Sequence, residues 1–263
     1  MELAHSPREV FTRTRTSRLS LSLAKNRCEV REAQRLRYRI FAKEMGARLD
    51  SPEFGLDRDY FDDFCQHLLV RDTGTGEVVG CYRILTDWQA VNAGGFYSET
   101  EFELEQILAL PGRFMEVGRT CIHPDYRNGA TIMLLWSGLA RFMTMNGVDH
   151  LIGCASIPMS AGGAEALSVF DQLREKYLSP PHLRVVPRLP LPRTDTASRP
   201  GAVVPTLLKG YLRLGAEICG EPCLDRAFNV ADVFVLLRSA NINRRYLRHF
   251  TNPSPGRDRV GIL

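Results

Sequence analysis

Apolar and polar residues follow two different periods along this chain. Residues 18–24 alternate one by one, which predicts a strand, because successive strand side chains point to opposite faces. Residues 29–46 carry apolar side chains at near-helical spacing and end at a glycine, which predicts a helix. Residues 67–86 hold two β-rich runs around Thr-Gly-Thr-Gly, which predicts a hairpin. The first third of the chain therefore predicts both helices and antiparallel strands.

The remainder continues to mix strand and helix patterns. We expect a loop or short turn at 55–65, a short helix at 99–110, a strand at 113–123, an apolar helix at 130–145, a buried strand at 148–157, an amphipathic helix at 162–178, an edge strand with an ordered loop in the proline-rich 179–205, a short helix at 206–216, a strand at 231–239 and a basic helix at 242–250. This order predicts a mixed α/β fold with one sheet. We expect a single domain over 1–263, with a core of about 18–190 and a C-terminal extension of about 191–263.

Composition is that of an ordinary globular protein. The chain has 263 residues, of which 44% are hydrophobic and 24% charged. No apolar run approaches the roughly 20 residues that span a bilayer, and the N-terminus lacks the apolar stretch of a signal peptide. Seven cysteines, an odd number without paired CxxC units, argue against a disulfide framework and a zinc ribbon. We expect a cytoplasmic protein, or one peripheral on the cytoplasmic membrane, with no metal.

Positive charge is concentrated at the two ends of the chain. Residues 1–27 hold six lysines and arginines against two acids, and residues 238–263 hold six arginines against Asp258. The net charge is only +4, so the middle of the chain is negative. Solvated termini explain this pattern, and so does a basic surface for an acidic partner, such as an anionic membrane or an acidic carrier protein. No nucleic-acid motif is present, so nucleic acid is not an expected partner.

The stretch Glu-Val-Gly-Arg-Thr-Cys-Ile-His-Pro-Asp-Tyr-Arg-Asn-Gly-Ala, residues 116–130, holds the strongest candidates for chemistry. Gly118 inside a strand predicts a bulge, which can turn an N–H group toward a carbonyl oxygen. A bulge would bring Glu116 and Arg119 toward one cleft, where a carboxylate can deprotonate an amine; a surface ion pair explains the same spacing. Arg127, Asn128, Gly129 and Ala130 at a helix start are typical of an anion site, or of an ordinary turn.

With these motifs, the chain resembles the bacterial ornithine–acyl carrier protein N-acyltransferases. These belong to the GNAT superfamily, are grouped with haemolysin-like proteins and are related to acyl-homoserine-lactone synthases. The resemblance rests on six segments: LRYRIFAKEMG, LDRDYFDDFCQHLLV, GEVVGCYRIL, EVGRTCIHPDYRNGA, PTLLKGYLRLGA and DVFVLLRSANINRRYLRHF. It implies a GNAT-like, largely antiparallel central sheet flanked by helices. The loop Arg127-Asn128-Gly129-Ala130 is shorter than the usual GNAT acyl-CoA loop, which favours an acyl carrier protein as donor.

The resemblance also implies a reaction. A 3-hydroxyacyl chain arrives as a thioester on carrier-protein phosphopantetheine, with no permanently bound cofactor, and the α-amino group of ornithine attacks the carbonyl. The bulge near Gly118 polarises that carbonyl. Glu116 serves as general base, directly or through a water, and Arg119 orients Glu116 or binds a carboxylate. The product is lyso-ornithine lipid, so this is the first step of ornithine lipid synthesis.

Five further residues match the lactone-synthase pattern and are expected to bind the acceptor. A cationic amino acid needs an acidic partner for its side-chain ammonium and a basic one for its carboxylate. The resemblance implies Asp59 or Asp62 for the first role and Arg37 or Arg83 for the second, with Phe41 on the same helix face as Arg37. A charged network that braces helix and sheet would explain the same residues.

Three alternatives remain at this stage. One is an acyl-homoserine-lactone synthase, another an acyltransferase for a different amine such as glycine, and the third a non-catalytic GNAT-like module that binds lipid or protein. Within the favoured family, the arginines of the terminal helix and the basic N-terminus are expected to contact the acidic carrier protein or an anionic membrane. Those arginines are Arg244, Arg245 and Arg248.

Overall fold

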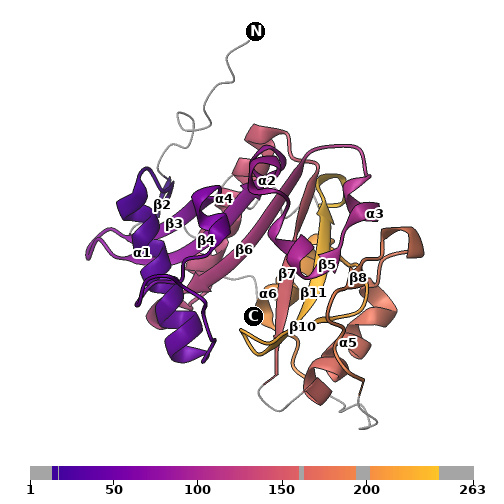
Figure 1. Cartoon of the computed structure of the whole chain (residues 1–263). Helices are drawn as coiled ribbons and strands as arrows, with labels where there is room; N and C mark the ends of the chain where they lie inside the picture. The colour runs from indigo at the N-terminus through magenta and orange to yellow at the C-terminus, as the bar shows by residue number, and fades with distance from the viewer. Residues whose placement is uncertain (1–13, 17, 160–162, 194–201, 243–263) are drawn as a thin grey trace.

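A computed structural model describes residues 14–16, 18–159, 163–193 and 202–242 of the chain. The described residues form one twisted nine-stranded sheet that crosses the molecule, with helices on both of its faces (Figure 1). The order along its path is β1-β2-β3-β4-β6-β7-β11-β10, and β9 pairs with β11. Its strands are β1 Thr14–Thr16, β2 Leu19–Leu23, β3 Gln66–Asp72, β4 Val78–Thr86, β6 Phe114–Ile122, β7 His150–Pro158, β9 Glu217–Ile218, β10 Cys223–Asp225 and β11 Val230–Arg238.

The predicted mixed fold with a largely antiparallel sheet is confirmed. Within this sheet only β6 and β7 run parallel, and the other pairs of its described strands are antiparallel. The hairpin of β3 and β4 is present, and β11, from the segment expected to be an extension, lies between β7 and β10 in the central sheet. The helical segments are α1 Arg27–Tyr38, η1 Arg39–Glu44, η2 Tyr60–Asp63, α2 Asp87–Ala93, η3 Tyr97–Thr100, α3 Glu105–Leu108, η4 Pro124–Tyr126, α4 Ala130–Asn146, α5 Gly163–Tyr177, η5 Pro181–Leu183, α6 Thr206–Leu214 and η6 Ser239–Asn241.

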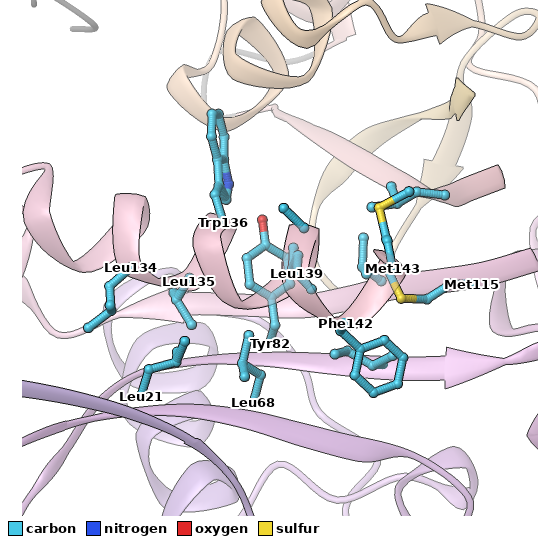
Figure 2. Close-up of a cluster of buried hydrophobic side chains, with 14 of the residues drawn as sticks. Leu21, Leu68, Tyr82, Met115, Leu134, Leu135, Trp136, Leu139, Phe142 and Met143 are labelled. Atoms are coloured by element: carbon cyan, nitrogen blue, oxygen red, sulfur yellow. The ribbon is translucent and has the colours of Figure 1, made fainter. Parts of the chain in front are cut away.

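Helix α4 forms the main core on one face of the sheet. Its apolar side chains lie between the helix and strands β2, β3, β4 and β6 (Figure 2). Gly138 allows the close approach, because a Cβ there would lie 2.8 Å from side-chain atoms of Leu21 and Leu68. Trp136 points away from these strands in Figure 2 and stacks on Tyr211 of α6, which extends the core toward β11. Burial on this scale stabilises the sheet, at roughly 1.5–3 kcal/mol for each large apolar side chain.

The opposite face of the sheet is covered by α1 and by short segments. Helix α1 packs on β3, β4 and β6. Leu36 of α1 and Ile40 and Phe41 of η1 share a buried cluster with Leu69, Cys81 and Cys121 of those strands. Farther along, Phe102 and Ile107 from the region between α2 and β6 pack on Ile152 and Phe234. Short segments leave room for polar side chains that long helices would cover, and the candidate site residues lie on this face.

Several expected elements differ in the structure. The helix expected over 99–110 is helical only at η3 and α3, because β5 Phe102–Glu103 interrupts it and pairs with β8 Val186–Pro187. The proline-rich edge strand is therefore two residues long and belongs to a separate two-stranded sheet. Strands β9 and β10 were not predicted. The basic helix at 242–250, including Arg244, Arg245 and Arg248, lies outside the described residues beyond position 242.

Strands β6 and β7 separate part-way along their length. They pair in parallel from Phe114↔His150 to Glu116↔Ile152, and no register pair follows among the described residues. Beyond that point β6 stays paired with β4 as far as Ile122, while β7 stays paired with β11 as far as Pro158. The two strands therefore separate after Val117, whose carbonyl oxygen still lies against Gly153, and this separation is a split in the sheet.

Candidate active site

Glu116 lies at the point where β6 and β7 separate, and its carboxylate anchors the η3 turn. One oxygen, Oε2, accepts a hydrogen bond from the Tyr97 backbone N–H at 2.7 Å; the other, Oε1, accepts from the Ser98 N–H at 2.7 Å and from the Ser98 hydroxyl. The residue is 4% exposed. Burial raises the pKa of Glu116, and the hydrogen bonds from Ser98 and Tyr97 offset part of that rise.

The predicted bulge is present, one residue beyond Gly118. Cys81 faces Cys121 and Arg83 faces Gly118, so Tyr82 lies opposite two residues of β6. The left-handed conformation falls on Arg119, with a φ of 49°, rather than on the glycine. A Cβ at Gly118 would meet nothing within 4 Å, so open space adjoins this position. The bulge bends β6 where the split opens, and it turns Arg119 toward the acidic segment before β3.

Arg37 is buried completely and holds two acids of that segment together. Its Nε donates to Asp57 Oδ2 at 2.8 Å, and its two terminal nitrogens donate to the Asp62 oxygens at 2.8 and 2.7 Å. Asp62 also caps η2 by accepting from the Asp59 N–H at 3.1 Å. Burial would raise the pKa of Asp62, but Arg37 and Arg83 lower it well below its usual range. This bidentate arrangement fixes α1 against the acidic segment and the sheet.

Asp59 lies between two arginines of neighbouring strands. Arg83 donates to Asp59 Oδ1 at 2.6 Å, and Arg119 donates to Asp59 Oδ2 at 3.1 Å. Tyr97 lies beneath both guanidiniums, with its ring centroid 5.4 Å from Arg83 and 5.0 Å from Arg119. Burial would raise the pKa of Asp59, but the two arginines lower it. Asp59 is half-buried, and it is more exposed than Arg83.

The structure brings together four of the predicted acceptor residues: Arg37, Asp59, Asp62 and Arg83. Phe41, the fifth predicted residue, is separated from Arg119 by the ring of Phe228. Its ring contacts Phe228 edge-on at 5.4 Å, and Phe228 in turn lies 4.7 Å from the Arg119 guanidinium. Arg119 contacts Asp57, Asp59 and Tyr97. Its link to Glu116 therefore runs through the Tyr97–Ser98 turn.

The segment expected to hold the donor lies at the start of α4. Gly129 has a φ of 82° and precedes the helix, whose first residue is Ala130. Asn128 accepts from the Ala130 N–H at 3.2 Å, which satisfies one of the free donors of this helix end. Arg127 forms a two-pronged ion pair with Glu44 at 2.6 and 2.8 Å, which ties the loop to the end of η1. Glu44 thus occupies Arg127, while Gly129 leaves the helix start accessible.

Sequence reasoning missed Asp57, Tyr97 and Ser98, which complete the site. The turn from Tyr97 to Thr100 has no periodic pattern, and its anchor, Glu116, comes later in the chain. A second group was also missed: Glu101, Asp225 and Asp232 each place a carboxylate oxygen within 4.8 Å of the others. These three acids come from separate segments, so no spacing in the sequence relates them.

The chain is similar to known proteins in both sequence and structure. The family described as "Acetyltransferase (GNAT) domain" matches residues 36–137. A protein of Rhizobium meliloti (strain 1021) is 37% identical over 254 residues, covering 90% of this chain and 85% of its own length. One of Brucella abortus (strain 2308) is 35% identical over 252 residues and 90% of each chain. Both are named L-ornithine N(alpha)-acyltransferase. The chain belongs to this family. It is therefore an N-acyltransferase, as the sequence predicts.

Solved structures agree with the fold of this N-acyltransferase. The AHL synthase LasI is 13% identical with a TM-score of 0.51, covering 93% of this chain and 100% of its own. FeeM, an N-acyl amino acid synthase from uncultured soil microbes, is 13% identical with a TM-score of 0.53, over 85% and 91% of the two chains. The GNAT-like fold is thereby confirmed. In the described part of the N-acyltransferase, none of the helices combines the length and the apolar character needed to cross a membrane.

Proposed function

We propose that this N-acyltransferase transfers a 3-hydroxyacyl group from acyl carrier protein to the α-amino group of L-ornithine. The product would be lyso-ornithine lipid, which makes this the first step of ornithine lipid synthesis. The observation that carries the proposal is the identity of 32–37% to relatives named L-ornithine N(alpha)-acyltransferase, over 90% or more of the chain. The buried charged site beside a split sheet supports it, because an amino-acid acceptor has charged groups to bind.

In the proposed reaction the thioester carbonyl lies in the split between β6 and β7, beside Gly118. The bulge frees backbone N–H groups of β6 from the ladder, and these can stabilise the oxyanion that forms. The amine nitrogen attacks the carbonyl carbon, the C–S bond breaks, and the pantetheine thiol leaves with a proton. No covalent acyl-enzyme is required, so Cys121 and Cys154 have no nucleophilic role.

Glu116 accepts the proton of the attacking amine in this proposal. Among the described residues, Oε2 of Glu116 accepts one hydrogen bond, from the Tyr97 N–H. A carboxylate oxygen can accept a second one, so Oε2 can still accept a hydrogen bond from the attacking amine or from a bridging water. The raised pKa of Glu116 suits a base that works near neutral pH. By holding Tyr97 and Ser98, the same carboxylate also positions the ring beneath Arg119. Glu116 is thus assigned both proton transfer and positioning.

The acceptor carboxylate is assigned to Arg119 and Arg83. Both guanidiniums contact Asp59. Arg119 Nε donates no hydrogen bond to the described residues, and its contact with Asp57 Oδ2 is an ion pair at 3.4 Å. Arg37 and Asp62 are assigned a scaffold role, because Arg37 is occupied by Asp57 and Asp62. Phe41 supports this scaffold through Phe228.

The donor arm is assigned to the start of α4. The helix end at Gly129 and Ala130 presents N–H groups and a partial positive charge, which suits a phosphopantetheine. Asn128 and Arg127 shape the loop that leads to it. An acidic carrier protein and an anionic membrane surface are the proposed partners of the basic termini, and the protein would work in the cytoplasm or at the inner face of the membrane.

An acceptor panel tests the proposed function. Purified protein is incubated with 3-hydroxyacyl carrier protein and one acceptor at a time: ornithine, lysine, glycine or S-adenosylmethionine, which is the acceptor of an acyl-homoserine-lactone synthase. The lipid products are identified by mass spectrometry. The proposal predicts acylated ornithine as the main product. Acylation of glycine alone would refute the acceptor and preserve the enzyme class. No transfer to any amine would favour a binding module.

A further inference from the structure

The three acids missed by sequence reasoning form a second charged cluster on the same face of the sheet. Asp232 of β11 lies opposite Ser156 of β7, and Glu101 follows directly after η3. Asp225 ends β10 and uses its Oδ1 to accept from the Ala227 and Phe228 N–H groups. Glu101 is 8% exposed and Asp232 only 3% exposed, so two carboxyl groups are buried together.

This acidic cluster has no cation among the described residues. Arg37, Arg83 and Arg119 are matched by Asp57, Asp59 and Asp62, and none of their ion pairs involves the cluster. One oxygen of each buried acid, Glu101 Oε2 and Asp232 Oδ1, lacks a hydrogen-bond partner in the part of the chain that the structure describes. Burial raises the pKa of both acids, and side-chain hydrogen bonds offset part of that rise, from Cys154 and Tyr97 for Glu101 and from Ser156 for Asp232. Buried acids without a counter-charge are costly, and they persist where a proton or a bound cation completes them.

The position of the cluster links it to the proposed acceptor site. The η3 turn and the residue after it connect the proposed base, the acceptor arginines and the acidic cluster. Ser98 contacts Glu116, Tyr97 contacts Arg119, and Glu101, directly after the turn, is a member of the cluster. Asp232 lies two strands away from Arg119 in the order of the sheet, on the other side of the split between β6 and β7. Arg119 is near enough to lower the pKa of Asp232, against the larger effect of burial.

We propose that Glu101, Asp225 and Asp232 bind the side-chain ammonium of the acceptor amino acid. The inference rests on the proposed function, because it assumes an amino-acid acceptor whose carboxylate lies at Arg119 and Arg83. An acceptor bound between the two clusters places its charged ends on opposite sides of the split and its α-amino group beside Glu116. The cluster then selects diamino acids over acceptors of the same length that lack the terminal amine.

Protonation of the free cluster gives the inference a pH signature. Burial and the neighbouring acids raise the pKa of Glu101 to about 9 and that of Asp232 to about 6. A lysine-like ammonium has a pKa near 10.4, so it stays charged while these carboxyls ionise. Binding of the ammonium therefore becomes stronger as pH rises from about 6 to 9. The other titratable or charged groups that act on Glu101 and Asp232 are Tyr97, Arg119, Cys154, Cys223 and Asp225.

The test compares ornithine with norvaline, which has the same carbon chain without the terminal amine. The quantity measured is the kcat/KM for ornithine divided by the kcat/KM for norvaline. We expect this ratio to favour ornithine in the wild-type protein, and we expect Glu101→Gln and Asp232→Asn each to lower it tenfold or more. Glu103→Gln is the matched control, since the same substitution is made at an exposed position two residues away, and it should leave the ratio unchanged. An unchanged ratio in both cluster variants would overturn the inference while leaving ornithine acylation intact.

Two further outcomes keep the inference separate from the proposed function. If the variants do not fold, the wild-type protein still decides: its KM for ornithine should fall from pH 6 to 9 by more than its KM for norvaline, and parallel changes would overturn the inference. Activity that is lost with EDTA and restored by a divalent cation would assign the cluster to a metal and also overturn it. Failure of the wild type to acylate ornithine, with glycine acylated instead, would refute the proposed function itself.

Discussion

Removal of the Ser98 hydroxyl is the most informative perturbation of the proposed base. The hydroxyl is fully buried and donates to Glu116 Oε1, and its second contact is with the Cys154 sulfur at 3.3 Å. In Ser98→Ala the carboxylate keeps the Tyr97 and Ser98 backbone N–H groups, so the η3 turn remains anchored. The substitution thus alters the proton affinity of Glu116 more than its position.

The size and sign of the effect follow from the hydrogen bond that is lost. A hydrogen bond to a charged group contributes about 1.5–3 kcal/mol, and 1.36 kcal/mol corresponds to one pKa unit. Because the hydroxyl stabilises the ionised carboxylate, its loss raises a pKa that burial has already raised. Two remaining donors compensate in part, so we expect a rise of about one unit. More of the base is then protonated, and activity below neutral pH falls.

The assay is the pH dependence of kcat from pH 5 to 9 with saturating ornithine and acyl carrier protein. Ser98→Ala should move the acid limb about one pH unit upward, and Glu116→Gln should lower kcat by about 10²–10⁴-fold and remove the limb. Thr100→Ala is the control, because its hydroxyl donates to Tyr97 in the same turn at 2.7 Å without touching Glu116. An acid limb that stays in place in Ser98→Ala, or full activity of Glu116→Gln at neutral pH, would refute the role of Glu116 as base.

Three further predictions follow from the contacts in and around the site. Arg37→Met should lower the free energy of unfolding in urea by about 3–5 kcal/mol, because it leaves two buried aspartates without their guanidinium; a loss below about 1 kcal/mol would contradict the scaffold role. Gly118→Ala should keep the wild-type Tm but lower kcat/KM tenfold or more, because the added methyl group enters open space in the proposed thioester path. Gly153→Ala is the contrasting variant: its Cβ would lie 2.4 Å from the Val117 oxygen, so it should lower Tm. Without the acceptor amino acid, the free energy of unfolding measured in urea should fall as pH rises from about 5 to 9, because the folded Glu101 carboxyl retains a proton that the unfolded chain releases. In Glu101→Gln the free energy of unfolding should depend less on pH. An equal slope in the variant and the wild type would exclude Glu101 as the source of the pH dependence.

Elements with strong local patterns could be predicted from the sequence. The apolar period of α4 and its left-handed Gly147, and the hairpin turn between β3 and β4, are encoded within short windows. The bulge was predicted from Gly118, although the positive φ falls on Arg119. Local signals therefore located the bulge of β6 to within one residue.

Features that depend on distant partners could not be predicted. The η3 turn is held by Glu116, and the segment after it pairs with β8, so its propensity for helix is overridden by tertiary contacts. The acidic residues near position 60 suggested partners for an ammonium, but their neutralisation by Arg37, Arg83 and Arg119 depends on the packing of α1 and the sheet. Glu101 and Asp232 come together because the η3 turn packs on β7 and β11 pairs with the same strand.

The position of the acyl group on ornithine tests the central claim most directly. Wild-type protein is supplied with 3-hydroxyacyl carrier protein and L-ornithine at neutral pH, and the nitrogen that carries the acyl group is identified by fragmentation in mass spectrometry. With the side-chain ammonium held by the acidic cluster and the α-amino group beside Glu116, the account predicts acylation of the α-nitrogen. Acylation of the δ-nitrogen, or no acylated ornithine, would contradict it.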